Sequence, residues 1–135
     1  MIVGIASGID EAVMAHARAE HPREACGLLL GIDGRILRAE PTRNVAARPE
    51  RSFEIEPAAL LRWHRTARGM AMTVIGWYHS HPNGVDKPSA TDAARAVEDG
   101  KLWLIATDAG VTAWRVVPNG AVHGRFEAVT LAAAA

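Results

Sequence analysis

The sequence has almost no cysteine: Cys26 is the only one among 135 residues. A lone cysteine excludes an internal disulfide and indicates a reducing compartment, so we expect the protein in the cytoplasm. The chain also lacks net charge, since Lys plus Arg and Asp plus Glu are 15 each. It therefore has no basic field that would attract nucleic acid. No apolar run approaches the length of a membrane span, and the N-terminus has no basic segment followed by an apolar one. We expect neither nucleic acid nor membrane as a partner.

The composition is otherwise that of an ordinary globular protein. Apolar residues make up 49% of the 135 positions, which is enough for one hydrophobic core without disulfide bridges. We find no linker and no internal repeat. The expected organisation is a single domain over residues 1–135.

Hydrophobic periodicity and turn residues predict helices that alternate with strands. The expected helices cover residues 9–20, 57–68 and 89–98. The expected strands cover residues 24–32, 35–40, 53–55, 72–81, 102–107, 111–117 and 121–129, after an apolar lead-in over residues 1–6. A mixed sheet flanked by helices accommodates this order.

The same patterns place several side chains. Three residues of the second helix are expected to pack on the sheet: Leu60, Leu61 and Trp63. Three residues of the third helix are expected to face inward: Ala93, Ala96 and Val97. His16 and His21 are expected on the solvated surface of the first helix, and residues 131–135 as a frayed tail.

The segment from His79 to Asp92 has a pattern that indicates chemistry. It reads His79-Ser80-His81-Pro82, then six residues, then Ser89-Ala90-Thr91-Asp92. Because side chains in a strand alternate between faces, His79 and His81 point the same way if the strand continues to its end. Pro82, Asn83-Gly84 and Pro88 turn the chain back, so Asp92 in the first turn of the next helix returns to the imidazoles. Two His and one carboxylate, with water at the fourth position, form a catalytic zinc arrangement.

Each half of this pattern also has a simpler explanation. A Ser-x-x-Asp sequence often does no more than cap a helix. A His-x-His pair can arise by coincidence in a chain with six histidines. The two halves joined by an enforced turn are much harder to obtain by chance, and this combination predicts a site for one zinc ion per chain.

The pattern resembles the signature of the JAMM (MPN+) metalloprotease family, in its minimal stand-alone bacterial form. That signature is an upstream Glu, then His-x-His-Pro, six residues and Ser-x-x-Asp. Here Glu24 precedes the short Gly-bounded segment Cys26-Gly27-Leu28-Leu29-Leu30-Gly31. The five signature positions match, and the resemblance spans most of the chain, from about Ile9 to the strands after Asp92. It implies an α/β fold with a mixed, mainly antiparallel, curved sheet flanked by helices, similar to that of cytidine deaminases.

The resemblance also implies a role for each signature residue. His79, His81 and Asp92 would hold zinc, Glu24 would be the general acid and base, and Ser89 would stabilise the oxyanion of the tetrahedral intermediate. From residue types alone, Glu24 could equally be a solvated charge at a strand start, and Ser89 could simply cap the helix. Cys26 lies two residues from Glu24 and could be near the metal, but a small buried hydrophobe is the better interpretation.

The substrate is implied by the resemblance alone. The loops are short, as in bacterial proteins that resemble peptidases cutting after the C-terminal Gly-Gly of small ubiquitin-like sulfur carriers. The segment 15–27 resembles the type that releases cysteine from a carrier–cysteine adduct. The alternatives are a general metallopeptidase without a carrier substrate and a non-catalytic MPN interaction scaffold, which would lose one or more ligands. A zinc nucleoside deaminase would need Pro-Cys-x-x-Cys and is excluded. A homodimer is left open.

Overall fold

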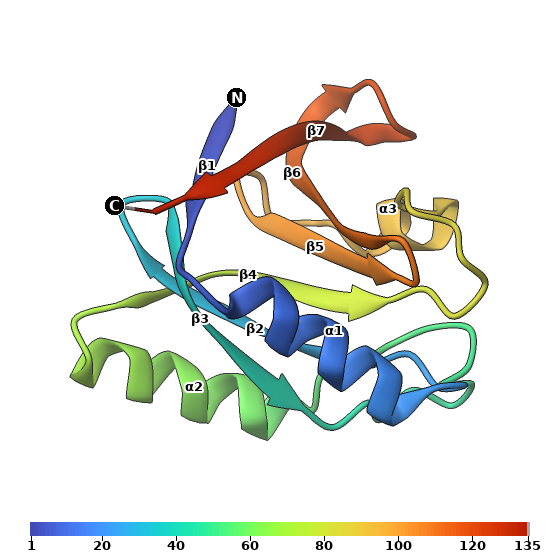
Figure 1. Ribbon diagram of the computed structural model, residues 1–135, viewed down its shortest axis with the longest axis horizontal. Coiled ribbons are helices and arrows are strands. Elements are labelled where there is room, and N and C mark those ends of the chain that lie inside the picture. Colours follow the sequence, from blue (N-terminus) through green and yellow to red (C-terminus); the bar gives the residue numbers. More distant parts are fainter. Residues whose placement is uncertain (135) are drawn as a thin grey trace.

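Seven strands form one mixed sheet in the computed structural model, which describes residues 1–134 (Figure 1). The order along the sheet is β1-β3-β2-β4-β5-β6-β7, and β1 pairs with both β3 and β7, so the sheet closes on itself. The strands are β1 (Ile2–Ile5), β2 (Cys26–Ile32), β3 (Arg35–Thr42), β4 (Thr73–Ser80), β5 (Leu102–Thr107), β6 (Gly110–Gly120) and β7 (Gly124–Ala133). The helices are α1 (Ile9–Glu20), α2 (Pro57–Gly69) and α3 (Ala90–Arg95). This mixed α/β architecture confirms the expected fold class.

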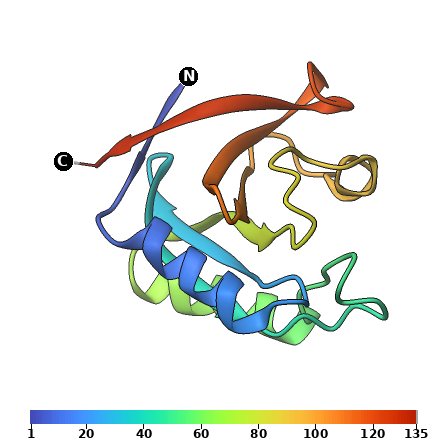
Figure 2. The same cartoon turned by 45° about the vertical axis from the view of Figure 1, so that its right-hand side comes forward.

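The strand β2 explains how two helices are placed on opposite faces of the sheet. Its side chains alternate, as strand geometry requires. Leu29 packs in the cluster that contains Val13 of α1, while Leu28 and Leu30 pack in the cluster that contains Ala67 of α2. Because both faces are covered, this strand reads as a continuous apolar run rather than an alternating one. Figures 1 and 2 show α1 and α2 on either side of β2 and β4.

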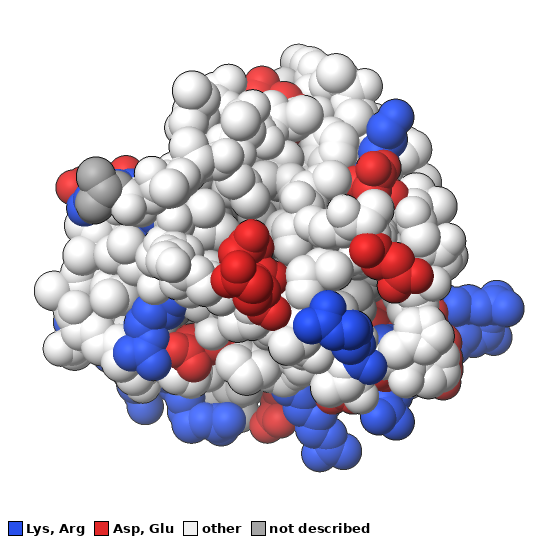
Figure 3. All heavy atoms as spheres, viewed as in Figure 1, with Lys and Arg blue, Asp and Glu red and all other residues white. Residues whose placement is uncertain are grey.

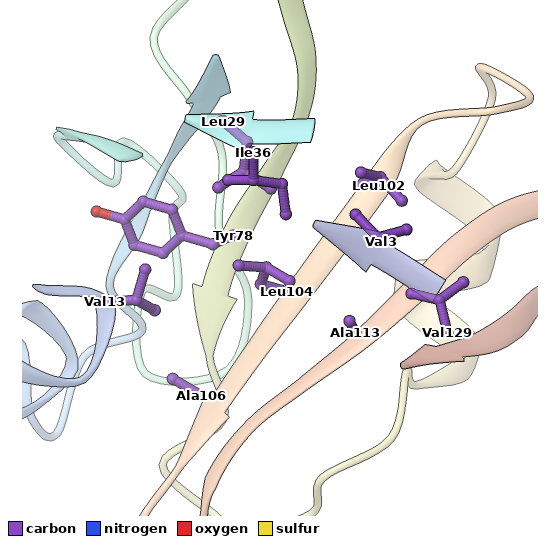
Figure 4. Packing of buried hydrophobic residues seen from close by; sticks show 10 residues of the cluster. All are labelled: Val3, Val13, Leu29, Ile36, Tyr78, Leu102, Leu104, Ala106, Ala113 and Val129. Atoms are coloured by element: carbon purple, nitrogen blue, oxygen red, sulfur yellow. The ribbon is translucent and has the colours of Figure 1, made fainter. Parts of the chain in front are cut away.

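The core beneath α1 is built around Tyr78 of β4, which is 2% exposed (Figure 4). Its ring lies so close to Gly27 that a Cβ there would stand 2.2 Å from Tyr78 Cε2. Only glycine permits that approach. The Tyr78 hydroxyl lies 2.7 Å from Nδ1 of His16 on α1. His16 is thus half-buried against the core, which corrects its expected place on the solvated helix surface, whereas His21 is exposed as expected.

The C-terminal segment corrects the expectation of a frayed tail. Residues 131–133 belong to β7 and pair in parallel with β1, with Leu131 opposite Val3 and Ala133 opposite Ile5. The poly-alanine sequence carries no strand signal of its own, and it is the unpaired edge of β1 that orders it. Ala135 lies outside the described residues.

Other element boundaries also differ from the sequence-based ones. Helix α3 ends at Arg95 instead of 98, so Ala96 is buried as expected but Val97 is 80% exposed. In α2, Leu60 and Trp63 pack on the sheet while Leu61 is 54% exposed. Residues 53–55 form no strand, only an isolated bridge between Asn44 and Ile55.

Charged side chains of both signs are present on the face seen in Figure 3, and most of the basic ones lie along its lower edge. Over the whole sequence the acidic and basic residues are equal in number. No helix within residues 1–134 is long and apolar enough to cross a lipid bilayer.

Candidate functional site

The expected convergence of His79, His81 and Asp92 is present at the C-terminal end of β4. The Nε2 atoms of His79 and His81 are 2.9 Å apart. Oδ2 of Asp92 lies 3.4 Å from Nε2 of His79 and 3.2 Å from Nε2 of His81. All three side chains are buried. Period-two alternation along β4 brings the imidazoles to one face, as the sequence predicted.

Asp92 reaches the imidazoles because the start of α3 is fixed by a capping box. Ser89 Oγ accepts a hydrogen bond from the backbone N–H of Asp92 at 3.0 Å, and Asp92 Oδ2 accepts one from the backbone N–H of Ser89 at 2.9 Å. The capping interpretation of Ser-x-x-Asp is therefore correct. It does not compete with the metal interpretation, because the cap is what orients the Asp92 carboxylate.

The geometry of these three groups fits a zinc ion. Tetrahedral bonds of 2.0–2.1 Å place neighbouring ligand atoms about 3.3–3.4 Å apart. The three separations here, 2.9, 3.2 and 3.4 Å, are close to that edge length. Small outward shifts of the imidazoles would bring the shortest separation to the ideal value.

The hydrogen-bond partners of His81 also favour a cation. Nδ1 of His81 lies 2.7 Å from the backbone carbonyl oxygen of Val85, which can only accept, so Nδ1 carries the proton. In the neutral imidazole, Nε2 then presents a lone pair toward the Asp92 carboxylate. Nε2 of His81 and Oδ2 of Asp92 are 3.2 Å apart. Their lone pairs repel each other unless a proton or a metal ion lies between the two atoms. Although burial opposes it, Asp92 raises the pKa of His81. Against the effect of burial, the hydrogen bonds of Asp92 with His79 and His81 keep the pKa of Asp92 below its usual range.

His79 is held by aromatic rings rather than by a hydrogen-bond acceptor. Its ring stacks on Phe53 with centroids 4.3 Å apart and meets Trp103 edge to face at 5.5 Å. Its buried Nδ1 has no hydrogen-bond partner within the described chain. Burial lowers the pKa of His79, which keeps the ring neutral as a metal ligand must be. Phe53 was not predicted as part of the site, because nothing in the sequence places a residue 26 positions away against this imidazole.

Glu24 lies beside the cluster and could be either a ligand or the partner of a water molecule. Its carboxylate, with His79 and His81, offers ligand atoms within 4.8 Å of one another. The side chain is 5% exposed. Burial raises the pKa of Glu24 to about 7, although the positive charge of His81 acts in the opposite direction. A carboxyl group with that pKa both accepts and donates a proton near neutrality.

The backbone of Glu24 is fixed by a loop that sequence reasoning did not connect with it. The amide nitrogen of the Asn44 side chain donates to the carbonyl oxygens of Glu24 at 2.9 Å and of Ser52 at 3.0 Å. The backbone N–H of Glu24 donates to Pro49 O at 2.7 Å. The Asn44 side chain thereby ties residues 45–52 to the strand that begins after Glu24. An Asn that precedes a polar loop was the only sequence signal for this tie.

A cleft of adjoining cavities surrounds the cluster. A cavity of about 220 Å³ is lined by Glu24, His81, Ser89 and Asp92, and by Arg51 and Phe53 from the polar loop. It shares Glu24, His81 and Arg51 with a cavity of about 490 Å³, and it shares Phe53 and Arg95 with an apolar one of about 420 Å³. The cluster is therefore reachable by a substrate of extended shape.

Ser80 and Cys26 are held by contacts within the fold. Ser80 Oγ accepts a hydrogen bond from the backbone N–H of Ala25 at 2.8 Å, on the face of β4 opposite to the imidazoles. Cys26 is fully buried, and its sulfur lies 3.5 Å from Thr42 Oγ1. Burial raises the pKa of the Cys26 thiol to about 11. The expectation of a small buried side chain at Cys26 is confirmed.

Comparison with known proteins identifies the family to which this chain belongs. The family model described as prokaryotic homologs of the JAB domain matches residues 7–117. The desampylase of Haloferax volcanii is 33% identical over 114 residues, which is 80% of this chain and 82% of that protein. A probable TtuB-protein conjugate cleaving protease of Thermus thermophilus is 30% identical, covering 89% of this chain and 79% of its own. The CysO-cysteine peptidase of Mycobacterium tuberculosis is 33% identical, covering 78% of this chain and 74% of its own.

Solved structures show the same fold. A protein from Desulfitobacterium hafniense, DSY2949, superposes with a TM-score of 0.80 at 26% identity, over 99% of this chain and 94% of its own. AF2198, a JAB1/MPN domain protein of Archaeoglobus fulgidus, superposes with a TM-score of 0.59 at 18% identity, over 96% of both chains. The second likeness identifies the fold alone.

Proposed function

We propose that this chain, which belongs to the family of prokaryotic homologs of the JAB domain, is a zinc-dependent peptidase that cuts after the C-terminal Gly-Gly of a small ubiquitin-like carrier protein. The bond cut is a peptide or isopeptide bond, in a carrier conjugate or in an adduct of the carrier with cysteine. One observation carries the proposal: two imidazoles and a carboxylate meet at zinc-like separations, with the raised-pKa Glu24 beside them in an open cleft.

In this proposal His79, His81 and Asp92 are the protein ligands of the metal. When bound, zinc would act as a Lewis acid that makes a water molecule acidic enough to attack at neutral pH and polarises the scissile carbonyl. The buried ring of His79, between Phe53 and Trp103, keeps this side of the site free of bulk water.

Glu24 moves the proton. Its carboxylate accepts a proton from the attacking water and then donates it to the nitrogen of the leaving amine. In the metal-free protein burial raises the pKa of Glu24 to about 7, so its protonated form is accessible near neutrality and the group suits both directions. The hydrogen bonds to Pro49 and Asn44 fix the backbone from which this carboxylate extends.

Ser89 stabilises the negative oxygen that develops on the attacked carbonyl. Its Oγ already accepts a hydrogen bond from the N–H of Asp92. The hydroxyl proton is left to donate, and Ser89 lines the same cavity as Glu24 and Asp92. A donor aimed at developing charge contributes roughly 3 kcal/mol of transition-state stabilisation.

The carrier substrate is supported by the names of relatives and by the shape of the site. Two of the relatives are named for cleaving TtuB–protein conjugates and CysO–cysteine. A terminal Gly-Gly lets the substrate backbone approach a buried cluster without side-chain collision. Residues 53–55 border the apolar part of the cleft, where the side chains of Phe53 and Ile55 can contact an extended tail.

The test is incubation of the zinc-loaded protein with a panel of carrier conjugates and carrier–cysteine adducts, with and without chelator, followed by intact mass. We expect a mass loss equal to the leaving group, abolished by chelator and by Glu24→Gln. Replacing the Gly-Gly terminus with Val-Val should slow cleavage strongly, because branched side chains restrict the backbone and obstruct its approach.

Two results would contradict the proposal in different ways. Equal rates on Gly-Gly and Val-Val substrates would leave a general metallopeptidase without carrier specificity. Full zinc occupancy without cleavage of any peptide substrate would leave a non-catalytic scaffold.

A further inference from the structure

The loop of residues 45–52 is a built part of the site rather than a loose connection. Oδ1 of Asn44 accepts hydrogen bonds from the backbone N–H groups of Ala46 at 3.0 Å and Glu54 at 3.1 Å. Together with its donations to Glu24 and Ser52, the Asn44 side chain holds both ends of the loop. These hydrogen bonds fix the backbone of the loop, from which the exposed side chains of Glu50 and Arg51 extend to the cleft.

Arg51 is the side chain of this loop that lines both cavities next to the cluster, of about 220 and 490 Å³. Within residues 1–134 its guanidinium makes no ion pair and no hydrogen bond. Asn83 lines the same two cavities, and its Oδ1 already accepts from the backbone N–H of Val85 at 3.0 Å. The side-chain amide of Asn83 is thus left to donate. Donors without an internal acceptor line the cleft next to Glu24.

The two sides of the cluster have different chemistry. The cavity of about 420 Å³ is lined mostly by apolar side chains, namely Phe53, Ile55, Leu60, Trp77 and Trp103, with Glu54 and Arg95 at its rim. Arg95 is already engaged, since its Nη1 donates to Phe53 O at 2.8 Å. The cavity of about 490 Å³ carries Arg51, Asn83 and Glu50 and has no large apolar side chain. An acyl chain suits the first side, and a charged leaving group suits the second.

We propose that the leaving group of this enzyme is a free amino acid, and that Arg51 binds its α-carboxylate with Asn83 as a second donor. The inference rests on the proposed peptidase function. Water adds to the terminal glycine carbonyl, the C–N bond breaks, and Glu24 protonates the departing nitrogen. The products are the carrier carboxylate and an amino acid. The α-carboxylate of that amino acid is attached one carbon away from the scissile nitrogen, so it must lie in the cavity that adjoins Glu24.

The charge pattern of a free amino acid fits this cavity better than that of a protein lysine. A lysine leaving group brings only an aliphatic chain to the position next to the scissile nitrogen. An α-carboxylate brings a planar anion, which the guanidinium fork binds with two parallel hydrogen bonds. Glu50 and the ionised form of Glu24 line the same cavity and oppose an anion, so Arg51 is the group that makes binding favourable.

The experiment compares two substrates that differ in one group. Both carry the carrier tail ending in Gly-Gly followed by alanine, with a free carboxylate in one and a carboxamide in the other. Alanine is used in place of cysteine because a thiolate would bind zinc directly. For the zinc-loaded full chain we expect kcat/KM to be about 10- to 100-fold higher for the carboxylate.

Three variants test which residue causes the preference for the carboxylate substrate. Arg51→Met should bring the ratio to about one by slowing the carboxylate substrate alone, while the amide rate stays unchanged and reports an intact metal site. Glu50→Gln should raise the ratio. Arg48→Met is the matched control: it removes the same charge from the same loop at a residue that lines neither cavity, and it should leave the ratio unchanged. As a readout without turnover, saturation-transfer NMR should detect L-alanine on the wild type and not on Arg51→Met.

The outcomes separate this inference from the proposed function. Equal cleavage of both substrates by the wild type would overturn the inference and leave the peptidase function standing. A carboxylate preference that survives Arg51→Met would also overturn it. Cleavage of neither substrate would contradict the peptidase function itself.

Discussion

Replacing Glu24 by Gln should stabilise the metal-free protein at pH 8 while it abolishes turnover. Glu24 is 5% exposed, and burial raises its pKa from 4.5 to about 7. In the folded protein the ionised form is therefore disfavoured. Gln has nearly the shape of protonated Glu and cannot ionise, so it removes this unfavourable charge and keeps the packing.

The direction of this stability change follows from the linkage between ionisation and folding. Because the folded pKa is above the unfolded one, the stability that Glu24 contributes is fully present below pH 4.5 and is lost as the pH rises through 7. Each pKa unit corresponds to 1.36 kcal/mol, so the upper limit is about 3.4 kcal/mol. Water at the mouth of the cleft screens the charge, and we expect about 1–2 kcal/mol above pH 7.5. This corresponds to an increase in Tm of about 3–8 °C for a domain of this size.

The assay is thermal unfolding of the chelated wild type and Glu24→Gln from pH 5 to 8.5, followed by circular dichroism. The difference in Tm should be small at pH 5, grow as the pH rises to about 7 and then level off. With zinc bound the difference should shrink, because the metal centre compensates the carboxylate charge. A variant that is equally destabilised at pH 5 and pH 8 would refute the reasoning, since it would mean that the ionised carboxylate is well solvated or paired in the folded protein.

Three further predictions concern the other residues of the site. His81→Ala should lose the metal, with zinc content by mass spectrometry falling from about one per chain to near zero while the circular dichroism spectrum is kept; retained zinc would remove His81 from the ligand set. Ser89→Ala should lower kcat about a hundredfold through the lost oxyanion donor and lower the free energy of unfolding by about 1 kcal/mol through the lost cap; a change in stability without a change in kcat would leave Ser89 as a cap only. Cys26 should resist iodoacetamide at pH 8 in the native state, because burial raises its pKa to about 11, and it should react once the chain is unfolded in urea; rapid native labelling, read by intact mass, would contradict its burial.

Local rules of chain geometry were sufficient for much of the metal cluster. Alternation along a strand brought His79 and His81 to one face, and Pro82, Asn83-Gly84 and Pro88 turned the chain so that Asp92 returned to them. The capping box at Ser89 is equally local, since its two hydrogen bonds span three residues. These features depend on neighbours in sequence, so a single sequence contains the information for them.

Long-range packing decided the rest. Phe53 lies on His79 because the polar loop folds back over the end of β4, and no period in the sequence encodes that contact. The four C-terminal alanines have no strand propensity, yet residues 132 and 133 pair with β1 because that edge offers unmatched backbone groups. Val97 was expected inside and is exposed because α3 ends at Arg95, where Arg125 donates hydrogen bonds to the carbonyl oxygen of Ala96 at 2.6 and 2.9 Å.

The sequence by itself determined which residue types could hold a metal and how the chain turns between them, because those constraints act over a few residues of backbone. Only the tertiary structure decided how Glu24 is buried, how Asn44 fixes it and where Arg51 stands relative to the cluster. The raised pKa of Glu24 depends on the solvent exposure and the charges around it. Solvent exposure and charge separation are properties of the packed chain, and they have no value until the sheet, the helices and the loop are in contact.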